Sequence, residues 1–250
     1  MPALSTSHLL LIPSYNAGPK LRETVAGALQ QWNPVWVVID GSNDGSDHDL
    51  ESLAGPGQEL KVLRLPRNRG KGTAVLHGIE LALTGGFTHA LTMDSDGQHP
   101  ASEIRRFMEC SQRRPEAMVL GRPVFDTSAP TERVMGRKLA NACAALVSAG
   151  GGIGDCLFGF RVYPLEAMRR AMRATRWARR FDFDPEVAVR MSWAGTPAVN
   201  EPCPVRYFRP DEGGVSHFNY LRDNVLLTWM FVRLAAGCLI RLPRLLRRRA

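Results

Sequence analysis

Short apolar runs alternate with polar segments along the first half of the chain. The runs occupy residues 9–12, 35–39, 61–65, 90–93 and 118–120, and Gly, Pro, Asp or Asn residues bound them. Runs of this length and composition predict the strands of a sheet that is covered on both faces.

Between these runs, apolar positions recur at helical spacing. One stripe is Leu21, Val25, Ala28, Leu29 and Trp32, and a second is Ala74, Val75, Ile79 and Ala82. Strands that alternate with single helices predict right-handed β-α-β units, and therefore an α/β fold with a mostly parallel central sheet flanked by helices. Further helices are expected near residues 101–113, 132–148, 165–173 and 185–193, and an extended segment at 198–207. A chain of 250 residues fits a single domain of this class.

A polar cluster directly follows each of the first four runs. The clusters are Pro13-Ser14-Tyr15-Asn16, Asp40-Gly41-Ser42, Asn68-Arg69-Gly70-Lys71-Gly72 and Asp94-Ser95-Asp96. Ligands of open α/β sheets bind beyond the carboxyl ends of the strands. We therefore expect the four clusters to converge on one crevice.

The fourth cluster has the composition of a divalent-cation site. Asp94 and Asp96 are separated by one residue at a strand end, and Gln98 follows. Mg²⁺ and Mn²⁺ take hard oxygen ligands, often one or two carboxylates together with substrate phosphates. The alternative is an acidic turn in which an Asp caps the helix near residues 101–113.

Six motifs in this order resemble the family 2 glycosyltransferases of the GT-A fold, and especially their dolichyl- or polyprenyl-phosphate branch. They are the first cluster, Asp40 to Ser46, Asn68 to Gly72, Asp94 to Pro100, Gly121-Arg122, and Asp155 with Gly159-Phe160-Arg161. The resemblance covers roughly residues 9–217 and is more specific than any one short motif. It implies an inverting transferase whose donor is a nucleotide-sugar such as a UDP- or GDP-sugar.

The resemblance also implies roles for single residues. The donor would be bound by Pro13, Tyr15, Asn16, Asp40, Asn68, Lys71, Asp94 and Ser95, and the metal, Mg²⁺ or Mn²⁺, by Asp94, Asp96 and Gln98. Asp96 would be catalytic through that metal. Two departures from the family pattern, Ile39 in place of a first Asp and Ala17 in place of a Glu, leave the identity of the nucleotide open.

Basic residues after the sheet are candidates for phosphate binding. The resemblance assigns this role to Arg122 and to Arg137, which lies four residues after Arg133 on one predicted helix face. A solvated helix face is the alternative for Arg133. The segment from Arg209 to His217 resembles the family's glycine-containing loop, in which Arg209 and His217 would supply charge or hydrogen bonds to the diphosphate.

Asp184 and Glu186 are candidate bases at the acceptor site. Either could deprotonate an acceptor hydroxyl, whereas a phosphate acceptor is already anionic and needs no base. The alternative is structural, with Asp184 as N-cap of a helix, Pro185 as its first residue and Glu186 in its first turn.

Charge and cysteine content exclude several classes of protein. The net charge is +8, but residues 220–250 hold seven Arg and one Asp, so +6 of it lies in the tail. A nucleic-acid binder needs basic residues spread over a contact surface, so we expect no nucleic-acid partner. The five cysteines contain no C-x-x-C pair, which argues against a disulfide framework or a zinc site. No basic, hydrophobic signal sequence begins the chain, so a cytoplasmic protein is expected.

We divide the chain into a catalytic domain, residues 1–219, and a basic amphipathic tail, residues 220–250. The apolar part of the tail, residues 225–240, is sixteen residues long and holds Arg233, whereas about 20 apolar residues are needed to cross a bilayer. We expect an interfacial helix that binds anionic lipid at the inner face of the plasma membrane. The alternative is a helix that packs on the catalytic domain or in a homodimer.

The sequence therefore predicts a metal-dependent glycosyltransferase that acts on a membrane-associated acceptor, polyprenyl phosphate or another lipid. A lipid hydroxyl is the alternative acceptor, and a metal-dependent nucleotidyltransferase is the alternative enzyme. Neither G-x-G-x-x-G nor G-x-x-x-x-G-K-[ST] occurs after a predicted strand, which argues against a dehydrogenase or a P-loop enzyme.

Overall fold

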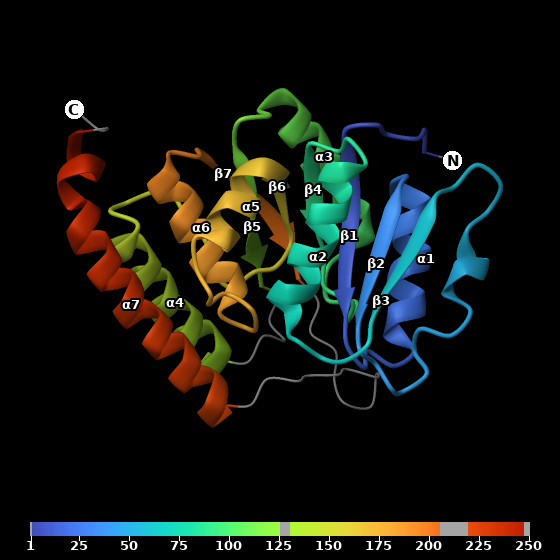
Figure 1. Cartoon of the computed structure of the whole chain (residues 1–250), viewed down its shortest axis with the longest axis horizontal. Helices are drawn as coiled ribbons and strands as arrows, with labels where there is room; N and C mark the ends of the chain where they lie inside the picture. The colour runs from blue at the N-terminus through green and yellow to red at the C-terminus, as the bar shows by residue number, and fades with distance from the viewer. Residues whose placement is uncertain (1, 126–130, 206–219, 248–250) are drawn as a thin grey trace.

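The computed structural model describes residues 2–125, 131–205 and 220–247. Its sheet has the order β3-β2-β1-β4-β6-β5-β7 (Figure 1). The strands are β1 His8–Ser14, β2 Val35–Asp40, β3 Leu60–Leu65, β4 His89–Thr92, β5 Met118–Val124, β6 Arg161–Pro164 and β7 Ala198–Pro204. All five predicted strands are present, and residues 198–204 of the expected extended segment form β7.

Strand pairing confirms the mostly parallel sheet. The pairs β1–β2, β2–β3, β1–β4 and β5–β7 are parallel, whereas β6 runs antiparallel to both β4 and β5. Strand β6 was not predicted, because its first residue is Arg161, a charged residue that breaks the apolar run although it is fully buried.

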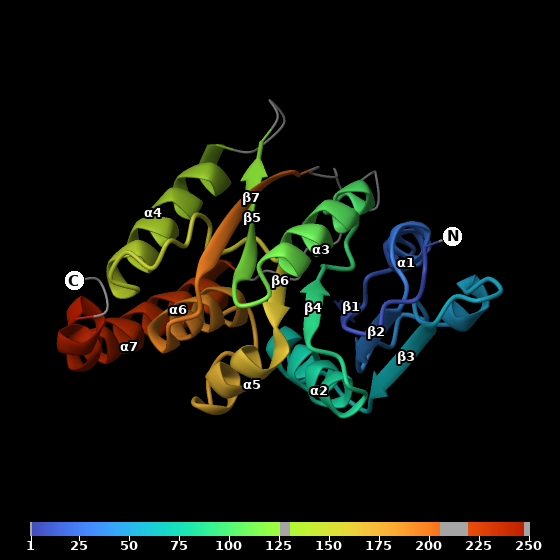
Figure 2. The same ribbon diagram turned by 90° about the horizontal axis from the view of Figure 1, so that it is seen from above.

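Helices cover both faces of the sheet (Figure 2). They are α1 Lys20–Gln31, α2 Lys71–Thr84, α3 Ile104–Arg113, α4 Thr131–Val147, α5 Leu165–Arg173, α6 Phe183–Ala194 and α7 Tyr220–Arg247, with short 3₁₀ helices at Leu50–Leu53 and Ala101–Glu103. Leu10 and Ile12 of β1 pack in one core cluster with α1 and α3, and Leu9 and Leu11 pack in the other with α2, α4, α5, α6 and α7. Alternate residues of a strand thus enter opposite cores.

Helix α7 lies beside α4 at the β7 end of the molecule (Figure 1). Within the section Arg222–Arg247, which is 26 residues long, an 18-residue stretch has a mean hydropathy of 1.8, so by length and composition this helix could cross a membrane. The helix continues through polar and charged residues at both ends of the apolar run, so the expectation that it does not span a bilayer stays a prediction. Met230, Leu234, Cys238 and Leu245 are buried in the core cluster, so one side of α7 packs against the rest of the fold.

Candidate active site

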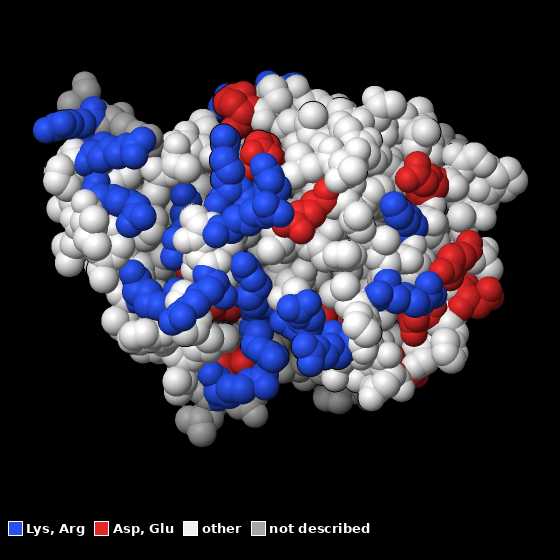
Figure 3. Space-filling model, viewed as in Figure 1, with Lys and Arg blue, Asp and Glu red and all other residues white. Residues whose placement is uncertain are grey.

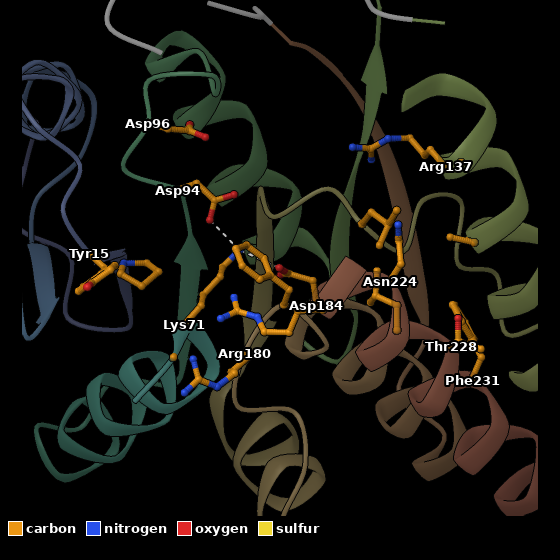
Figure 4. A pocket seen from close by; sticks show the side chains of 18 of the residues that line it. Tyr15, Lys71, Asp94, Asp96, Arg137, Arg180, Asp184, Asn224, Thr228 and Phe231 are labelled. Carbon is orange, nitrogen blue, oxygen red and sulfur yellow. Dashed lines mark hydrogen bonds and ion pairs between the residues drawn. The ribbon is translucent and has the colours of Figure 1, made fainter. Parts of the chain in front are cut away.

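One cavity of about 1250 Å³ opens beyond the carboxyl ends of the parallel strands (Figure 4). Each of the four polar clusters contributes to its wall, as expected from the topology. The contributing residues are Pro13, Ser14, Tyr15, Asp40, Asn68, Gly70, Lys71, Asp94, Ser95 and Asp96, and Gln98 joins them. The loops that follow β1, β2, β3 and β4 therefore meet at one place.

Lys71, the first residue of α2, lies between two carboxylates in this cavity. Its Nζ is 2.6 Å from Asp94 Oδ1 and 2.7 Å from Asp184 Oδ2. Burial opposes the charge on Lys71, but attraction to Asp184 and Asp94 exceeds it and raises the pKa of Lys71. Burial likewise opposes the charge on Asp94, but Lys71 lowers the pKa of Asp94 below its usual value. Lys71 and Asp94 are therefore both charged at neutral pH.

Asp96 has the opposite electrostatic character. Burial, reinforced by repulsion from Asp94, raises the pKa of Asp96 to about 6. Its Oδ1 accepts a hydrogen bond of 3.0 Å from the backbone N–H of Gln98. Two neighbouring carboxylates that repel each other, with an amide oxygen beside them, fit a divalent cation, because a cation would offset the repulsion. Within the described residues no cluster of three or more His, Cys, Asp or Glu offers a metal site, so Gln98 or substrate oxygens would have to complete the ligand set.

Asp40 is buried and holds the loop that leads into α2. Its carboxylate accepts hydrogen bonds from the backbone N–H groups of Arg69, at 2.9 Å, and Gly70, at 2.7 Å. Asp40 still lines the cavity, so contact with a nucleotide is compatible with this second task. Asn16 does not line the cavity, because its side chain exchanges hydrogen bonds with Asn43.

The two candidate phosphate-binding arginines occupy different positions. Arg137 lines the cavity, where its Nη1 is 2.6 Å from the buried carboxylate of Asp155. Arg122 is exposed and absent from the cavity wall, because β5 continues to Val124 and Arg122 lies within the strand instead of after it. The expectation for Arg122 is corrected accordingly. The side chain of Arg133, together with Arg209 and His217, lies outside the described residues.

The two candidate bases differ sharply. Asp184 lines the cavity and its Oδ1 has no hydrogen-bond partner in the described part of the chain. Glu186 is fully buried and does not line the cavity; it pairs with Arg190 and Arg233 and cannot reach an acceptor. Glu186 is therefore a structural residue, which corrects its assignment as a base. Of the structural alternative, the position of Glu186 in the first turn is confirmed, but Asp184 is not the N-cap, because α6 begins at Phe183 and Asp184 also lies in its first turn.

Sequence reasoning missed residues that support the site. Arg161 is fully buried, and its Nη1 donates to the backbone oxygen of Asp184 at 2.7 Å. At Gly159 an added Cβ would lie 2.6 Å from Asp94 Oδ2 and 2.7 Å from Lys71 Nζ, so only glycine leaves room for this ion pair. The motif Gly159-Phe160-Arg161 signalled these positions but not their tasks. Arg180 also lines the cavity.

Residues 10–171, more than half of the chain, match the family model described as glycosyl transferase family 2. The chain belongs to this family.

Relatives of this family 2 protein include lipid-phosphate sugar transferases. The polyprenol monophosphomannose synthase of Mycolicibacterium smegmatis is 29% identical over 170 residues, 65% of this chain and 63% of that protein. The dolichyl-phosphate beta-glucosyltransferase ALG5C of Trichomonas vaginalis is 30% identical over 201 residues, 72% of this chain and 58% of that protein. The chain thus spans less than two thirds of the length of these relatives.

A solved structure shows the same fold as this family 2 chain. Glucosyl-3-phosphoglycerate synthase from Mycobacterium tuberculosis, in complex with Mn²⁺, UDP-glucose and phosphoglyceric acid, has a TM-score of 0.65 and 15% identity, and the match covers 94% of this chain and 80% of that one. The GT-A fold expected from the sequence is confirmed.

Proposed function

We propose that this chain transfers a sugar from a nucleotide-sugar to a polyprenyl phosphate or another lipid acceptor at a membrane surface. One observation carries the proposal: a single cavity joins the charged side chains of Lys71, Asp94 and Asp96 to an apolar groove between α4 and α7 (Figure 4). A polar, charged donor and an apolar acceptor chain can therefore occupy two ends of the same space.

The apolar end of the cavity suits a lipid chain. Its wall is built by α4 and α7, which contribute Leu139, Ala140, Cys143, Leu146, Leu227, Phe231, Val232 and Ala235. Leu139 is 69% exposed and Leu146 is 77% exposed, so the groove opens to the outside. Binding of a hydrocarbon chain in this groove is favourable, by roughly 25 cal/mol per Å² of apolar surface that is removed from water.

In this proposal three arginines bind the phosphates of the donor and the acceptor. Arg137, Arg180 and Arg222 line the cavity, and a guanidinium presents its N–H donors in a fork that matches phosphate oxygens. The acceptor oxygen would form a bond to the anomeric carbon as the bond to the nucleoside diphosphate breaks, with inversion. A phosphate acceptor needs no base, which fits an Asp184 whose Oδ2 is already bound by Lys71 Nζ.

Asp94, Asp96 and Gln98 would hold Mg²⁺ or Mn²⁺ in this proposal. The ion would act as a Lewis acid that stabilises the departing diphosphate. Mn²⁺ and UDP-glucose, the ligands of the crystallised neighbour, belong to the classes proposed here. The names of two relatives contain polyprenol and dolichyl phosphate, the acceptor class proposed here.

A donor screen tests this function. We expect UDP-glucose, GDP-mannose or another UDP-, GDP- or dTDP-sugar to give a lipid-linked sugar with dolichyl or undecaprenyl phosphate in detergent, and to release nucleoside diphosphate. Removal of divalent cations with EDTA should stop transfer, and MnCl₂ should restore it. Release of pyrophosphate from a nucleoside triphosphate would indicate the nucleotidyltransferase alternative, and chelator-resistant transfer would contradict the metal.

The outer face of α4 and α7 is a candidate membrane surface. Eleven large apolar side chains are exposed in the described residues, and nine of them belong to these two helices: Met135, Leu139, Leu146, Val225, Trp229, Val232, Leu239, Ile240 and Leu246. Lys and Arg gather over α5, α6 and α7 in Figure 3. Within or next to these helices, the exposed arginines include Arg173, Arg176, Arg180, Arg244 and Arg247. An exposed apolar patch beside a basic surface is typical of a protein that binds anionic membranes. We propose that this face binds the cytoplasmic side of the plasma membrane.

Leu239→Glu combined with Ile240→Glu is expected to release the protein from anionic vesicles. These side chains are 70% and 79% exposed, and each Leu or Ile withdrawn from lipid loses roughly 1.5–3 kcal/mol of transfer free energy. Binding to phosphatidylglycerol-containing vesicles, measured by co-sedimentation, should fall at least tenfold. Leu4→Glu, at a residue 55% exposed outside both helices, is the control. Unchanged vesicle binding of the double variant, or a dimer in light scattering that the substitutions dissociate, would favour a protein partner on this face.

A further inference from the structure

Arg233 is a charged residue in the apolar part of α7, and its side chain crosses to α6. Its Nη1 lies 3.2 Å from Glu186 Oε1 and its Nη2 lies 3.0 Å from Glu186 Oε2. The guanidinium also stacks over the ring of Trp177, 4.4 Å from the ring centroid. Because Glu186 is fully buried, this bidentate ion pair is shielded from solvent and fixes where α7 meets α6.

The same arginine faces the turn that precedes α6. Its Nη2 is 3.9 Å from Asp182 Oδ2. Asp182 is buried, and its carboxylate accepts hydrogen bonds of 3.0 Å from the backbone N–H groups of Ala178 and Arg180. Asp182 therefore holds the turn of residues 177–182 in shape, and Arg233 lies against both Asp182 and Trp177.

This turn packs directly on the first residues of α2. The N–H of Gly72 donates to the backbone oxygen of Arg179 at 3.0 Å. A Cβ on Gly70 would lie 2.3 Å from that oxygen, and one on Gly72 would lie 2.2 Å from the oxygen of Ala178. Two glycines are thus required where backbone meets backbone, so displacement of the turn displaces the start of α2.

Lys71 lies between these two glycines. The turn positions its backbone, and Asp184, in the first turn of α6, binds its Nζ. A continuous set of contacts therefore runs from Arg233, through Glu186, Asp182 and the 177–182 turn, to the cluster of Lys71, Asp94 and Asp184.

We propose that Arg233 is a positioning residue for the Lys71 cluster, so that α7, the helix with the proposed membrane face, is part of the scaffold of the reaction site. Arg233 acts from outside the cavity, because it is absent from the cavity wall. The effect on turnover rests on the proposed function, whereas the effect on the backbone of α2 does not.

The test compares Arg233→Met with Arg241→Met. Arg241 also lies on α7 and stacks on an α6 ring, 4.9 Å from the centroid of Trp193, but at the opposite end of α6 from Asp184. Hydrogen–deuterium exchange of the amides of residues 70–72 is measured in full-length protein. We expect Arg233→Met to speed exchange of the Gly72 amide at least tenfold, and Arg241→Met to leave it at the wild-type rate.

Steady-state kinetics in detergent, with the nucleotide-sugar that the donor screen selects, provide the second readout. A shift of about 1 Å in a reacting group costs on the order of 100-fold in rate, so we expect kcat of Arg233→Met to fall at least tenfold at a temperature where the variant is folded. Arg233→Lys, which keeps the charge but not the fork, should recover part of both effects; if Arg233→Met does not fold, Arg233→Lys against wild type carries the test.

Wild-type exchange at Gly72 in a folded Arg233 variant would overturn the proposal, whatever the substrate is. Equal acceleration in Arg241→Met would overturn it too, since any loosening of α7 would then suffice. Faster exchange at Gly72 with no nucleotide-sugar turnover by the wild-type protein would support the positioning role and refute the proposed function instead.

Discussion

Asp96→Asn is expected to lower sugar transfer at least 100-fold while leaving the folded protein as stable as wild type or more stable at neutral pH. The amide keeps the shape of the side chain and can still accept the N–H of Gln98. It cannot offer a charged ligand to a divalent cation, and loss of a charge-stabilising group typically costs 10²–10³ in kcat. Turnover with and without MnCl₂ and the melting temperature are the measurements.

The sign of the stability effect follows from the pKa of Asp96. Burial and the charge of Asp94 raise this pKa to about 6 from 3.8, so the charged form is less favourable in the folded chain than in the unfolded chain. This penalty is absent below the unfolded pKa and fully present above the folded one, so Asp96→Asn removes it at pH 7. Because Asp96 is partly exposed, solvent screens part of this penalty. We therefore expect Asp96→Asn to raise the free energy of unfolding by about 1 kcal/mol. Asp49→Asn, at an exposed residue outside the cavity, is the control. A large loss of stability in Asp96→Asn would contradict this account.

Much of the architecture follows from the sequence, because buried strands and amphipathic helices have periodic apolar positions. The strand at 35–39 and the stripe through Ala74, Val75 and Ile79 are examples, and both appear where predicted. Convergence of the polar clusters also follows, because parallel strands end at one edge of a sheet. Strand β6 does not follow, since its buried Arg161 is satisfied by groups that only the tertiary structure supplies.

The division of labour between Asp184 and Glu186 shows what local sequence cannot determine. Residues that are two positions apart on a helix point about 200° apart, so the carboxylate of Asp184 faces the cavity and that of Glu186 faces α7. Which of them lines the site depends on where Lys71 and Arg233 lie, and these residues are 113 and 47 positions away along the chain. The pattern of charges within residues 181–186 is the same in either arrangement.

The tail illustrates a third limit. An arginine inside an apolar helix predicts either a helix that avoids the membrane core or a buried ion pair, and only the structure supplies the buried partner Glu186. Helix α7 has one side packed on the domain and another exposed, so the two interpretations of the tail describe different faces of one helix. The packed face is observed, and membrane contact by the exposed face stays a proposal.

Lys71→Met is expected to give the largest loss of stability, about 3–5 kcal/mol at neutral pH, because it leaves the buried carboxylate of Asp184 and the partly exposed one of Asp94 without their cation. Asp94 and Asp184 both bind Lys71 Nζ, and Asp184 Oδ1 already has no hydrogen-bond partner among the described residues. Lys20→Met is the matched control: Lys20 also begins a helix and forms an ion pair of 2.8 Å, but with an exposed Glu23, so its loss should cost less than about 1 kcal/mol.

The loss caused by Lys71→Met should shrink as the pH falls. In the wild-type protein Lys71 lowers the pKa of Asp94, a contribution that is present above the unfolded pKa and is lost as the pH falls through the folded pKa. In the variant Asp94 keeps the opposing effect of burial without the attraction of Lys71, so it binds a proton more readily and the burial penalty is relieved in acid. Chemical denaturation of both proteins at about pH 7 and at about pH 4.5 measures the gap. A gap that is independent of pH would show that Lys71 stabilises the fold through packing and not through its charge.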